Sequence, residues 1–347
     1  MDYATKTKSQ VITYMLNTVN KMTVIKIFEP GGPEVLTPFE TTIPAPKAGE
    51  VLIRVEAAGV NRPDIIQRQG YYPMPEDATP IPGLEIAGTV SSTGEGVSTL
   101  QVGDRVCALT NGGGYGEYCI VPESQTLPVP DSMSMIESAA LPETLFTVWA
   151  NLFKLGGAKQ GQSVLIHGGT SGIGTTALML CREFGIEAYA TAGSDDKCGV
   201  IADLGATPIN YRTIDFSDFI LNQTNGHGVD IILDIMGASY FSRNMRSLAM
   251  DGRLVIIGFL GGIYAEQVNL QELALKRAIV TGSTMRARTT VEKAEIANDL
   301  LKKIWPVLDT GRCHPIIHRT FPLREAARAH ELMESGKHVG KIVLTMN

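Results

Sequence analysis

A glycine-rich segment near the middle of the chain carries the residues best suited to hold a phosphate-containing ligand. After the apolar run at 164–166 the segment reads Gly169, Thr170, Ser171, Gly172, Ile173 and Gly174. Glycines let the backbone approach a pyrophosphate closely, and a helix that begins there offers free N–H groups and a positive dipole end. Gly169 and Gly174 match the first and third glycines of the G-x-G-x-x-G pattern, whereas Ser171 stands at the second. The segment predicts a dinucleotide site, and the alternative is a tight turn without a ligand.

The end of the next expected strand indicates which dinucleotide is bound. Enzymes that use NAD usually place an Asp or Glu there to hold the ribose hydroxyls, but this strand ends at Gly193 without an acid. Ser194 and Lys197 can face a 2′-phosphate, by a hydrogen bond and by charge, and Tyr211 can close over the same group. Asp195–Asp196 oppose this interpretation. The pattern predicts NADPH, and the alternative is that Ser194 and Lys197 only begin an exposed helix.

Alternating elements surround these two motifs. The expected strands are 163–167, 188–192, 229–234 and 252–257, and the helices between them are 174–184, 197–204 and 239–248. Apolar strands between helices indicate a parallel sheet that is covered by helices on both faces. Residues 146–290 are therefore predicted to form a doubly wound, Rossmann-type nucleotide-binding domain within an α/β protein.

The regions on either side of this domain have a different pattern. Residues 22–145 contain short alternating strands bounded by turn residues, as in a β-barrel or sandwich. Residues 291–347 contain one expected long helix, Val291–Asp309, followed by strand-like runs. We therefore expect 22–145 and 291–347 to form one β-rich domain into which the nucleotide-binding domain is inserted. Residues 1–21 are expected to be a disordered extension.

The overall composition excludes several classes of protein. The 347 residues carry a formal net charge of −6, and no cluster of Lys and Arg is dense enough for a nucleic-acid surface. The longest apolar runs, such as Leu254–Leu260, fall far short of the roughly 20 residues of a membrane-spanning helix. The five cysteines are scattered and odd in number, which indicates a reducing compartment. A cytoplasmic protein that binds neither a membrane nor nucleic acid is expected.

Several segments together resemble the medium-chain dehydrogenase/reductase superfamily. They are Ala57–Asp64, Pro82–Gly88, Val102–Val106, Leu141–Thr144, the glycine-rich segment and Gly340–Leu344. The resemblance covers nearly all of the chain from Met22 to Asn347, and it implies a GroES-like catalytic domain with an inserted Rossmann domain. It also implies a homodimer, with the strand near Gly252–Gly262 at the shared edge.

The positions that hold the catalytic zinc in the zinc alcohol dehydrogenases of this superfamily carry other residues here. Asn61 replaces a Cys after a Gly-Val pair, and Leu84 replaces a His before a Glu. Asn is a poor zinc ligand and Leu is none, so no metal is expected. Without a Lewis acid, dehydrogenating an alcohol is difficult, whereas quinones and enones are already activated for reduction. The segment Asn61–Pro73 is similar to the zinc-independent quinone oxidoreductase, or zeta-crystallin-like, branch.

The resemblance implies roles for individual residues. Tyr72, or its neighbour Tyr71, is expected to donate a hydrogen bond or a proton to the acceptor, whose developing negative charge needs stabilisation. Asn61 is expected to orient the acceptor or the cofactor carboxamide, and Asp64 to anchor the loop more than to transfer protons. Further implied cofactor contacts are Thr147, Gly237, Phe259, Leu260, Gly261, Arg286 and Lys341. The alternatives are a packing role for Tyr72 and a solvated face for Arg286.

We therefore expect an NADPH-dependent quinone oxidoreductase whose partner is a small quinone-like acceptor. An NADPH-dependent enoyl-thioester reductase remains an alternative, because such enzymes also work without zinc and keep a loop tyrosine. A third interpretation is an NADPH-binding protein with a structural or RNA-binding role, which the acidic charge disfavours.

Overall fold

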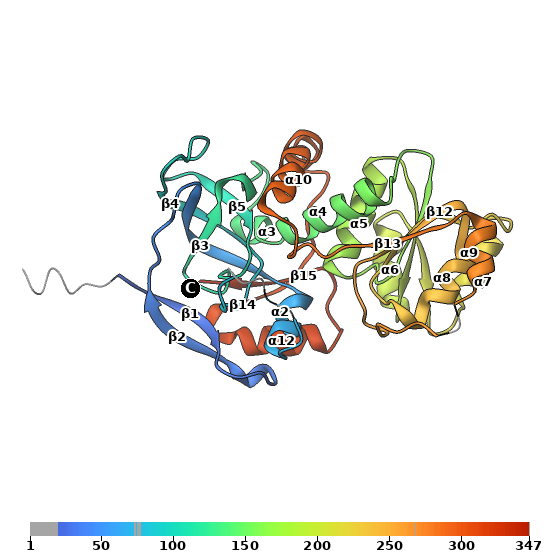
Figure 1. Cartoon of the computed structure of the whole chain (residues 1–347), viewed down its shortest axis with the longest axis horizontal. Helices are drawn as coiled ribbons and strands as arrows, with labels where there is room; N and C mark the ends of the chain where they lie inside the picture. Colours follow the sequence, from blue (N-terminus) through green and yellow to red (C-terminus); the bar gives the residue numbers. More distant parts are fainter. Residues whose placement is uncertain (1–19, 73, 75–77, 267, 347) are drawn as a thin grey trace, which may run out of the picture.

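The computed structural model describes residues 20–346 apart from 73, 75–77 and 267. Two sheet-containing parts lie side by side, and helices α4 (Pro142–Val148) and α10 (Thr290–Lys303) lie between them (Figure 1). No helix in this described part of the chain is long and apolar enough to cross a membrane.

One part is built on a six-stranded sheet in which every neighbouring pair is parallel. Its strand order is β10-β9-β8-β11-β12-β13. The strands are β8 (Ser163–Ile166), β9 (Glu187–Ala192), β10 (Thr207–Asn210), β11 (Val229–Asp234), β12 (Leu248–Ile256) and β13 (Ile279–Gly282). The connecting helices are α5 (Gly172–Glu183), α6 (Asp195–Asp203), α7 (Phe216–Gln223), α8 (Phe241–Ser247) and α9 (Leu270–Lys276). The expected Rossmann-type domain is confirmed.

The other part is built on a seven-stranded, mostly antiparallel sheet with the order β14-β15-β3-β4-β5-β7, and β6 also pairs with β3. The strands are β3 (Glu50–Val60), β4 (Glu85–Thr93), β5 (Arg105–Leu109), β6 (Tyr118–Pro122), β7 (Thr126–Pro128), β14 (Ile317–Pro322) and β15 (Lys341–Thr345). A separate hairpin joins β1 (Lys21–Ile27) to β2 (Leu36–Thr42). Because β15 pairs antiparallel with the second half of β3, the chain returns to its first sheet, as expected for an inserted Rossmann domain.

The helices of this second part are short. They are α2 (Arg62–Arg68), α3 (Met135–Ser138), α11 (Trp305–Asp309) and α12 (Ala326–Glu334). Single-turn 3-10 helices lie at Pro33–Val35, Glu123–Gln125 and Leu323–Glu325, and in the nucleotide-binding part at Ala238–Tyr240. Helix α2 begins directly after β3, so the residues of the β3–α2 junction are held at a fixed place in the sheet.

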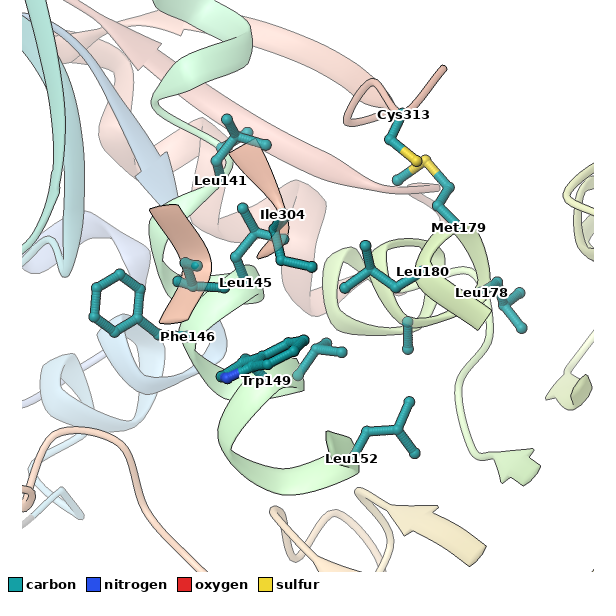
Figure 2. Close-up of a cluster of buried hydrophobic side chains, with 14 of the residues drawn as sticks. Leu141, Leu145, Phe146, Trp149, Leu152, Leu178, Met179, Leu180, Ile304 and Cys313 are labelled. Atoms are coloured by element: carbon teal, nitrogen blue, oxygen red, sulfur yellow. The ribbon is translucent and has the colours of Figure 1, made fainter. Parts of the chain in front are cut away.

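Buried apolar side chains pack between the two parts along α4. Leu145 lies beside Ile304 and faces Leu180 of α5, with Leu141 above it and the ring of Trp149 below it (Figure 2). Burial of such side chains stabilises the fold by roughly 1.5–3 kcal/mol each. Helix α4 continues into a π-helical segment, Trp149–Leu155. The expected boundary between the domains at 145/146 therefore falls inside a packed helix.

The C-terminal helix was expected to run unbroken over Val291–Asp309, and this is wrong. The structure has two helices, α10 and α11, which are separated at Ile304. Pro306 explains the break, because proline has no N–H to donate and its ring clashes with the preceding turn. The division places Trp305 at the start of α11, where its indole N–H donates to the Pro128 carbonyl at 2.9 Å.

Two further expectations about elements are corrected. Lys21 already belongs to β1, although it was assigned to the disordered extension, and residues 1–19 lie outside the described residues. The strand near Gly252–Gly262 was expected at a sheet edge, but β12 lies between β11 and β13. The edges of the parallel sheet are β10 and β13, because the chain continues past β12 through α9 and adds one more strand.

Candidate active site

The glycine-rich turn leads from β8 into α5, as a phosphate-binding turn requires. A Cβ atom added to Gly174 would collide with the backbone of the turn, and one added to Gly169 would lie 2.6 Å from a side chain of β9. The Ser171 hydroxyl caps α5 by accepting a hydrogen bond from the Gly174 N–H at 3.0 Å. The N–H groups of Gly172 and Ile173 have no acceptor within the helix and remain available for an anion.

Residues from the seven-stranded sheet and from α4 close over this turn. The Gly340 N–H donates to the Thr170 carbonyl at 2.8 Å, directly before β15. The Lys341 side chain lies across Gly172 so closely that an added Cβ would collide with it, and Thr144 of α4 lies beside the same glycine. A dinucleotide bound at this turn would therefore extend along the junction of the two parts.

The end of β9 brings the expected 2′-phosphate residues together. An added Cβ on Gly193 would lie 2.6 Å from the Tyr211 hydroxyl oxygen, so Tyr211 covers this glycine. Ser194 caps α6, where its hydroxyl accepts from the Lys197 N–H at 3.4 Å. The Lys197 ammonium donates to two backbone carbonyls of the loop 336–338, at 2.7 and 3.0 Å. An ammonium has three N–H donors, so one remains for a further acceptor.

The two aspartates that argued against NADPH are placed differently. Asp195 accepts a hydrogen bond from the Asn210 side chain at 2.7 Å, which turns its carboxylate toward β10. Asp196 is exposed. Partial burial lowers the pKa of Lys197. Because one aspartate is engaged and the other faces solvent, the acids oppose a bound phosphate less than the sequence suggests.

A buried polar cluster lies next to Lys341. Its ammonium forms an ion pair with Glu85 Oε1 at 2.6 Å and donates to Asn61 Oδ1 at 2.5 Å. The Asn61 amide donates in turn to Glu85 Oε1 at 2.8 Å. The second oxygen of Glu85 accepts the backbone N–H of Glu143 at 2.8 Å. Both polar atoms of the Asn61 side chain are thus engaged, and the cluster ties the β3–α2 junction to β4, β15 and α4.

Asp64 anchors the start of α2. Its Oδ2 accepts from the Asn61 N–H at 2.8 Å and from the Tyr115 hydroxyl at 3.2 Å, and its Oδ1 accepts from the Gly83 N–H at 3.0 Å. Complete burial raises the pKa of Asp64 to about 6. With its oxygens committed to three protein donors, the carboxylate is placed to hold the loop and not to reach an acceptor.

A hydrogen-bonded chain runs from Asp64 to α12. Arg68 has only donors, so it donates to His330 Nδ1, at 3.3 Å. The neutral ring then carries its proton on Nε2 and donates to the Tyr115 oxygen at 3.0 Å, and Tyr115 donates to Asp64. Burial and the nearby Arg68 lower the pKa of His330 to about 3, which keeps the ring neutral. Arg68 also forms paired hydrogen bonds with Glu334 at 2.8 and 3.1 Å.

Tyr72 and Arg286 face each other beside these clusters. The guanidinium carbon lies 5.2 Å from the centroid of the Tyr72 ring, and Arg286 donates to the Gln67 side chain at 2.8 Å and to the Asn111 carbonyl at 3.0 Å. Among the described residues, its buried Nε has no hydrogen-bond partner. Burial raises the pKa of Tyr72 to about 12, which suits its hydroxyl to hydrogen bonding. The structure does not bring Tyr71 to this place, because that side chain is 80% exposed.

The remaining expected cofactor contacts lie on α4 and at the carboxyl end of β11. Thr147 is buried on α4. Gly237 has φ +73°, and its N–H donates to Asp234 at 3.1 Å. The turn 259–261 is hydrogen-bonded to the backbone just after β11, and its Phe259 side chain is more than half exposed. Gly237 and the turn 259–261 lie at the same end of the parallel sheet as the glycine-rich turn, namely at the carboxyl ends of its strands.

Comparisons with known proteins identify the family. Residues 47–131 match the alcohol dehydrogenase GroES-like domain, and residues 204–344 match zinc-binding dehydrogenase. The quinone oxidoreductase of Rattus norvegicus is 32% identical over 329 residues, which cover 94% of this chain and 98% of the relative. The chain belongs to the medium-chain dehydrogenase/reductase superfamily. Within this superfamily it is an oxidoreductase of the zeta-crystallin-like branch.

Two solved structures share the fold of this medium-chain dehydrogenase/reductase over nearly its whole length. A mycobacterial protein complexed with NADPH has a TM-score of 0.82 and 30% identity, covering 93% of this chain and 99% of its own. The CurK enoyl reductase has a TM-score of 0.81 and 29% identity, covering 94% of this chain and 99% of its own. The expected family and fold class are confirmed.

Sequence reasoning missed two acidic residues of this medium-chain dehydrogenase/reductase, Glu85 and Glu143. Both stand inside segments that carried the resemblance, Pro82–Gly88 and Leu141–Thr144. The available signal was an acidic residue among small and apolar neighbours at the end of a buried element. Acidic side chains are seldom buried unless they have a charged or hydrogen-bonding partner. Tyr115 was missed as well, because its partners Asp64 and His330 are distant in sequence.

Proposed function

We propose that this oxidoreductase uses NADPH to reduce quinones, or related activated carbonyl and enone acceptors, without a metal ion. The observation that carries the proposal is the Lys341–Glu85–Asn61 cluster. At the position where zinc-dependent relatives hold the metal, both polar atoms of Asn61 are committed to buried protein partners. A lysine ammonium in contact with this position also disfavours a bound cation.

The donor set does not suit the zinc that the name of the matched family implies. Leu84 offers no ligand atom, and an amide is a poor one. Within the described ranges, no group of three or more His, Cys, Asp or Glu residues is placed to hold a metal ion. We therefore derive no step through zinc, and a preactivated acceptor is the chemistry that these side chains favour.

The residues at the junction suit NADPH. The turn has glycines where a Cβ would block a ligand, free N–H groups at Gly172 and Ile173, and a spare donor on Lys197 for the 2′-phosphate. When bound, NADPH supplies a hydride from its nicotinamide ring. Thr147, Gly237 and the turn 259–261 are positioned to hold the other half of the cofactor.

Two side chains are placed to stabilise the reduced acceptor. An acceptor that receives a hydride gains negative charge on an oxygen atom, and donors fixed in advance lower the energy of that state. The Tyr72 hydroxyl and the Arg286 Nε–H are such donors, because Gln67 and Asn111 already hold the guanidinium in place. The acceptor is thus expected between Tyr72 and α4.

Two further properties belong to the proposal. The five cysteines are all free, which supports a reducing, cytoplasmic compartment. The edge strand β13 exposes Ile279, and helix α9, which precedes it in sequence, has Leu270 and Leu275 about two-thirds exposed. These apolar side chains support a homodimer through this edge.

An enoyl-thioester reductase is the second candidate, supported by the structural similarity to the CurK enoyl reductase. The deciding experiment follows NADPH oxidation against ortho- and para-quinones and short enoyl thioesters, with NADH and a zinc chelator as controls. Quinone turnover that prefers NADPH and is insensitive to the chelator is expected. Turnover of thioesters alone would replace the proposal with the second candidate, and loss of activity with the chelator would refute the metal-free mechanism.

A further inference from the structure

Glu143 is fixed at the junction between the two parts. It follows Pro142 in the first turn of α4, and its backbone N–H donates to Glu85 Oε2 at 2.8 Å. Glu85 is itself held by Lys341, whose side chain crosses the glycine-rich turn. The position of Glu143 is therefore set by the same cluster that closes over the phosphate-binding site.

The side chain of Glu143 is buried, but among the described residues its carboxyl group has no hydrogen-bond partner. The residue is 9% exposed, and among the described residues the only hydrogen bond of Glu143 outside its helix is that of its backbone N–H. Thr147, the expected neighbour of the nicotinamide, lies one turn later on the same face of α4, since residues four apart are neighbours on a helix. Glu143 therefore shares a face of α4 with Thr147, and its carboxyl group has no hydrogen-bond partner among the described residues.

Titratable groups from four elements and two loops act on this carboxyl. Glu85 on β4 and Asp64 on α2 repel its charge, whereas Lys341 on β15 and Lys293 on α10 attract it. Tyr72 and Arg286, which lie in two loops, also interact with it. Lys341 is committed to Glu85 and Asn61. Burial, followed by the charge of Glu85, raises the pKa of Glu143 to about 8, so the group is mostly neutral at pH 7.

We propose that Glu143 is the proton donor of this enzyme, protonating the oxygen of the acceptor once the hydride has arrived. This inference rests on the proposed function, with NADPH as the reductant. The O–H bond of the Glu143 carboxyl breaks, an O–H bond of the hydroquinone or enol forms, and the carboxylate regains its proton from water. One hydride and one proton together complete the two-electron reduction of a quinone.

The other acidic groups of the site are less suited to this step. The pKa of Tyr72 is raised to about 12 by burial, so its hydroxyl releases a proton far less readily than a carboxyl group. Asp64 uses its oxygens to accept three hydrogen bonds from the protein. A general acid works best when its pKa lies near the working pH, and in this site Glu143 combines that property with an uncommitted carboxyl group.

The test compares Glu143→Gln with Glu331→Gln, a matched change on the exposed face of α12. In wild type, kcat for quinone reduction is expected to fall as pH rises through about 8, because the donor loses its proton. Glu143→Gln is expected to lower kcat about 100-fold, as for loss of a general acid, and to abolish this alkaline limb. Glu331→Gln is expected to behave as wild type.

Two readouts do not depend on turnover. Infrared titration of the unliganded protein should show a protonated-carboxyl band that disappears through about pH 8 and is missing in Glu143→Gln. Fluorescence titration should show that Glu143→Gln still binds NADPH with affinity close to wild type, which separates proton donation from a structural role. A Glu143→Gln variant that loses both NADPH binding and activity would overturn the assignment in favour of a structural role.

The failures of the two proposals are distinguishable. If wild type reduces quinones but Glu143→Gln keeps the rate and the alkaline limb, the proton-donor role is overturned and the proposed function stands. If no quinone or enone supports NADPH oxidation by the wild-type protein, the proposed function fails and the donor role fails with it. The absence of the infrared band in wild type would overturn the donor role whatever the activity.

Discussion

Replacement of Lys197 by Ala should separate the two nicotinamide cofactors. In the structure the ammonium gives two of its three N–H donors to carbonyls of the loop 336–338. The third has no acceptor among the described residues, and we propose that it meets the 2′-phosphate, which NADH lacks. Lys197→Ala should therefore weaken NADPH specifically, in addition to any effect of losing the loop contacts.

The size of the effect follows from one charge-assisted hydrogen bond. Such bonds contribute about 1.5–3 kcal/mol, and the lower half of that range applies because Lys197 is only partly buried. The dissociation constant for NADPH should rise roughly 10- to 40-fold, since 1.4 kcal/mol is a factor of ten. Loss of the two carbonyl contacts acts on both cofactors, so the NADH titration measures that part separately.

Fluorescence titration of both cofactors is the assay, with Lys337→Ala as the control. Lys337 lies in the same loop and is exposed, so its replacement removes an equal charge without removing the ammonium that bonds the carbonyls. It should change the binding of NADPH by no more than about twofold, as for exposed charges. An equal loss of NADH and NADPH affinity in Lys197→Ala would refute the 2′-phosphate assignment and leave the lysine only a structural role.

Three further outcomes are expected. Tyr72→Phe should lower kcat for quinone by about tenfold, the value of one hydrogen bond, and keep the alkaline limb; loss of that limb in a pH profile would show that Tyr72 is the acid. His330→Ala should lower the free energy of unfolding in urea by about 2–3 kcal/mol, because the Tyr115 hydroxyl and a donor of Arg68 lose a buried partner, whereas the half-exposed His314→Ala should have little effect. Ile279→Lys should shift a dimer to monomers in sedimentation experiments, and an unchanged dimer would place the interface elsewhere.

Local motifs explain how much of the fold the sequence could predict. The apolar strands and the glycine-rich turn are contiguous in sequence, and their periodicity reports directly which faces are buried. The Rossmann-type domain and the return of the chain to its first sheet were therefore predictable. The break at Ile304 could have been anticipated from Pro306, whereas the position of β13 at the edge depends on the packing of the last crossover and left no local pattern.

The candidate site was predictable only where one segment carries the chemistry. Gly169 to Gly174 lie on one turn, but the Lys341–Glu85–Asn61 cluster joins three distant segments, and no spacing within any of them reveals the contact. The sequence could not show which of the two neighbouring tyrosines faces the site. Only the path of the loop decides that Tyr72 packs beside Arg286 and that Tyr71 is exposed. The pKa of Glu143 likewise depends on burial and on a second acid from another strand.

The pairing of β15 with β3 has a consequence for how the protein reaches this structure. Lys341 follows Val60 by 281 residues, so this half of β3 is left with an open edge until nearly the whole chain has been synthesised. The parallel sheet is contiguous in sequence and can complete its own pairing earlier. Contacts between such distant residues form slowly, and an exposed strand edge meanwhile invites pairing with other chains. Deleting 341–345 should therefore raise aggregation during expression as well as remove the ammonium that holds the Lys341–Glu85–Asn61 cluster together.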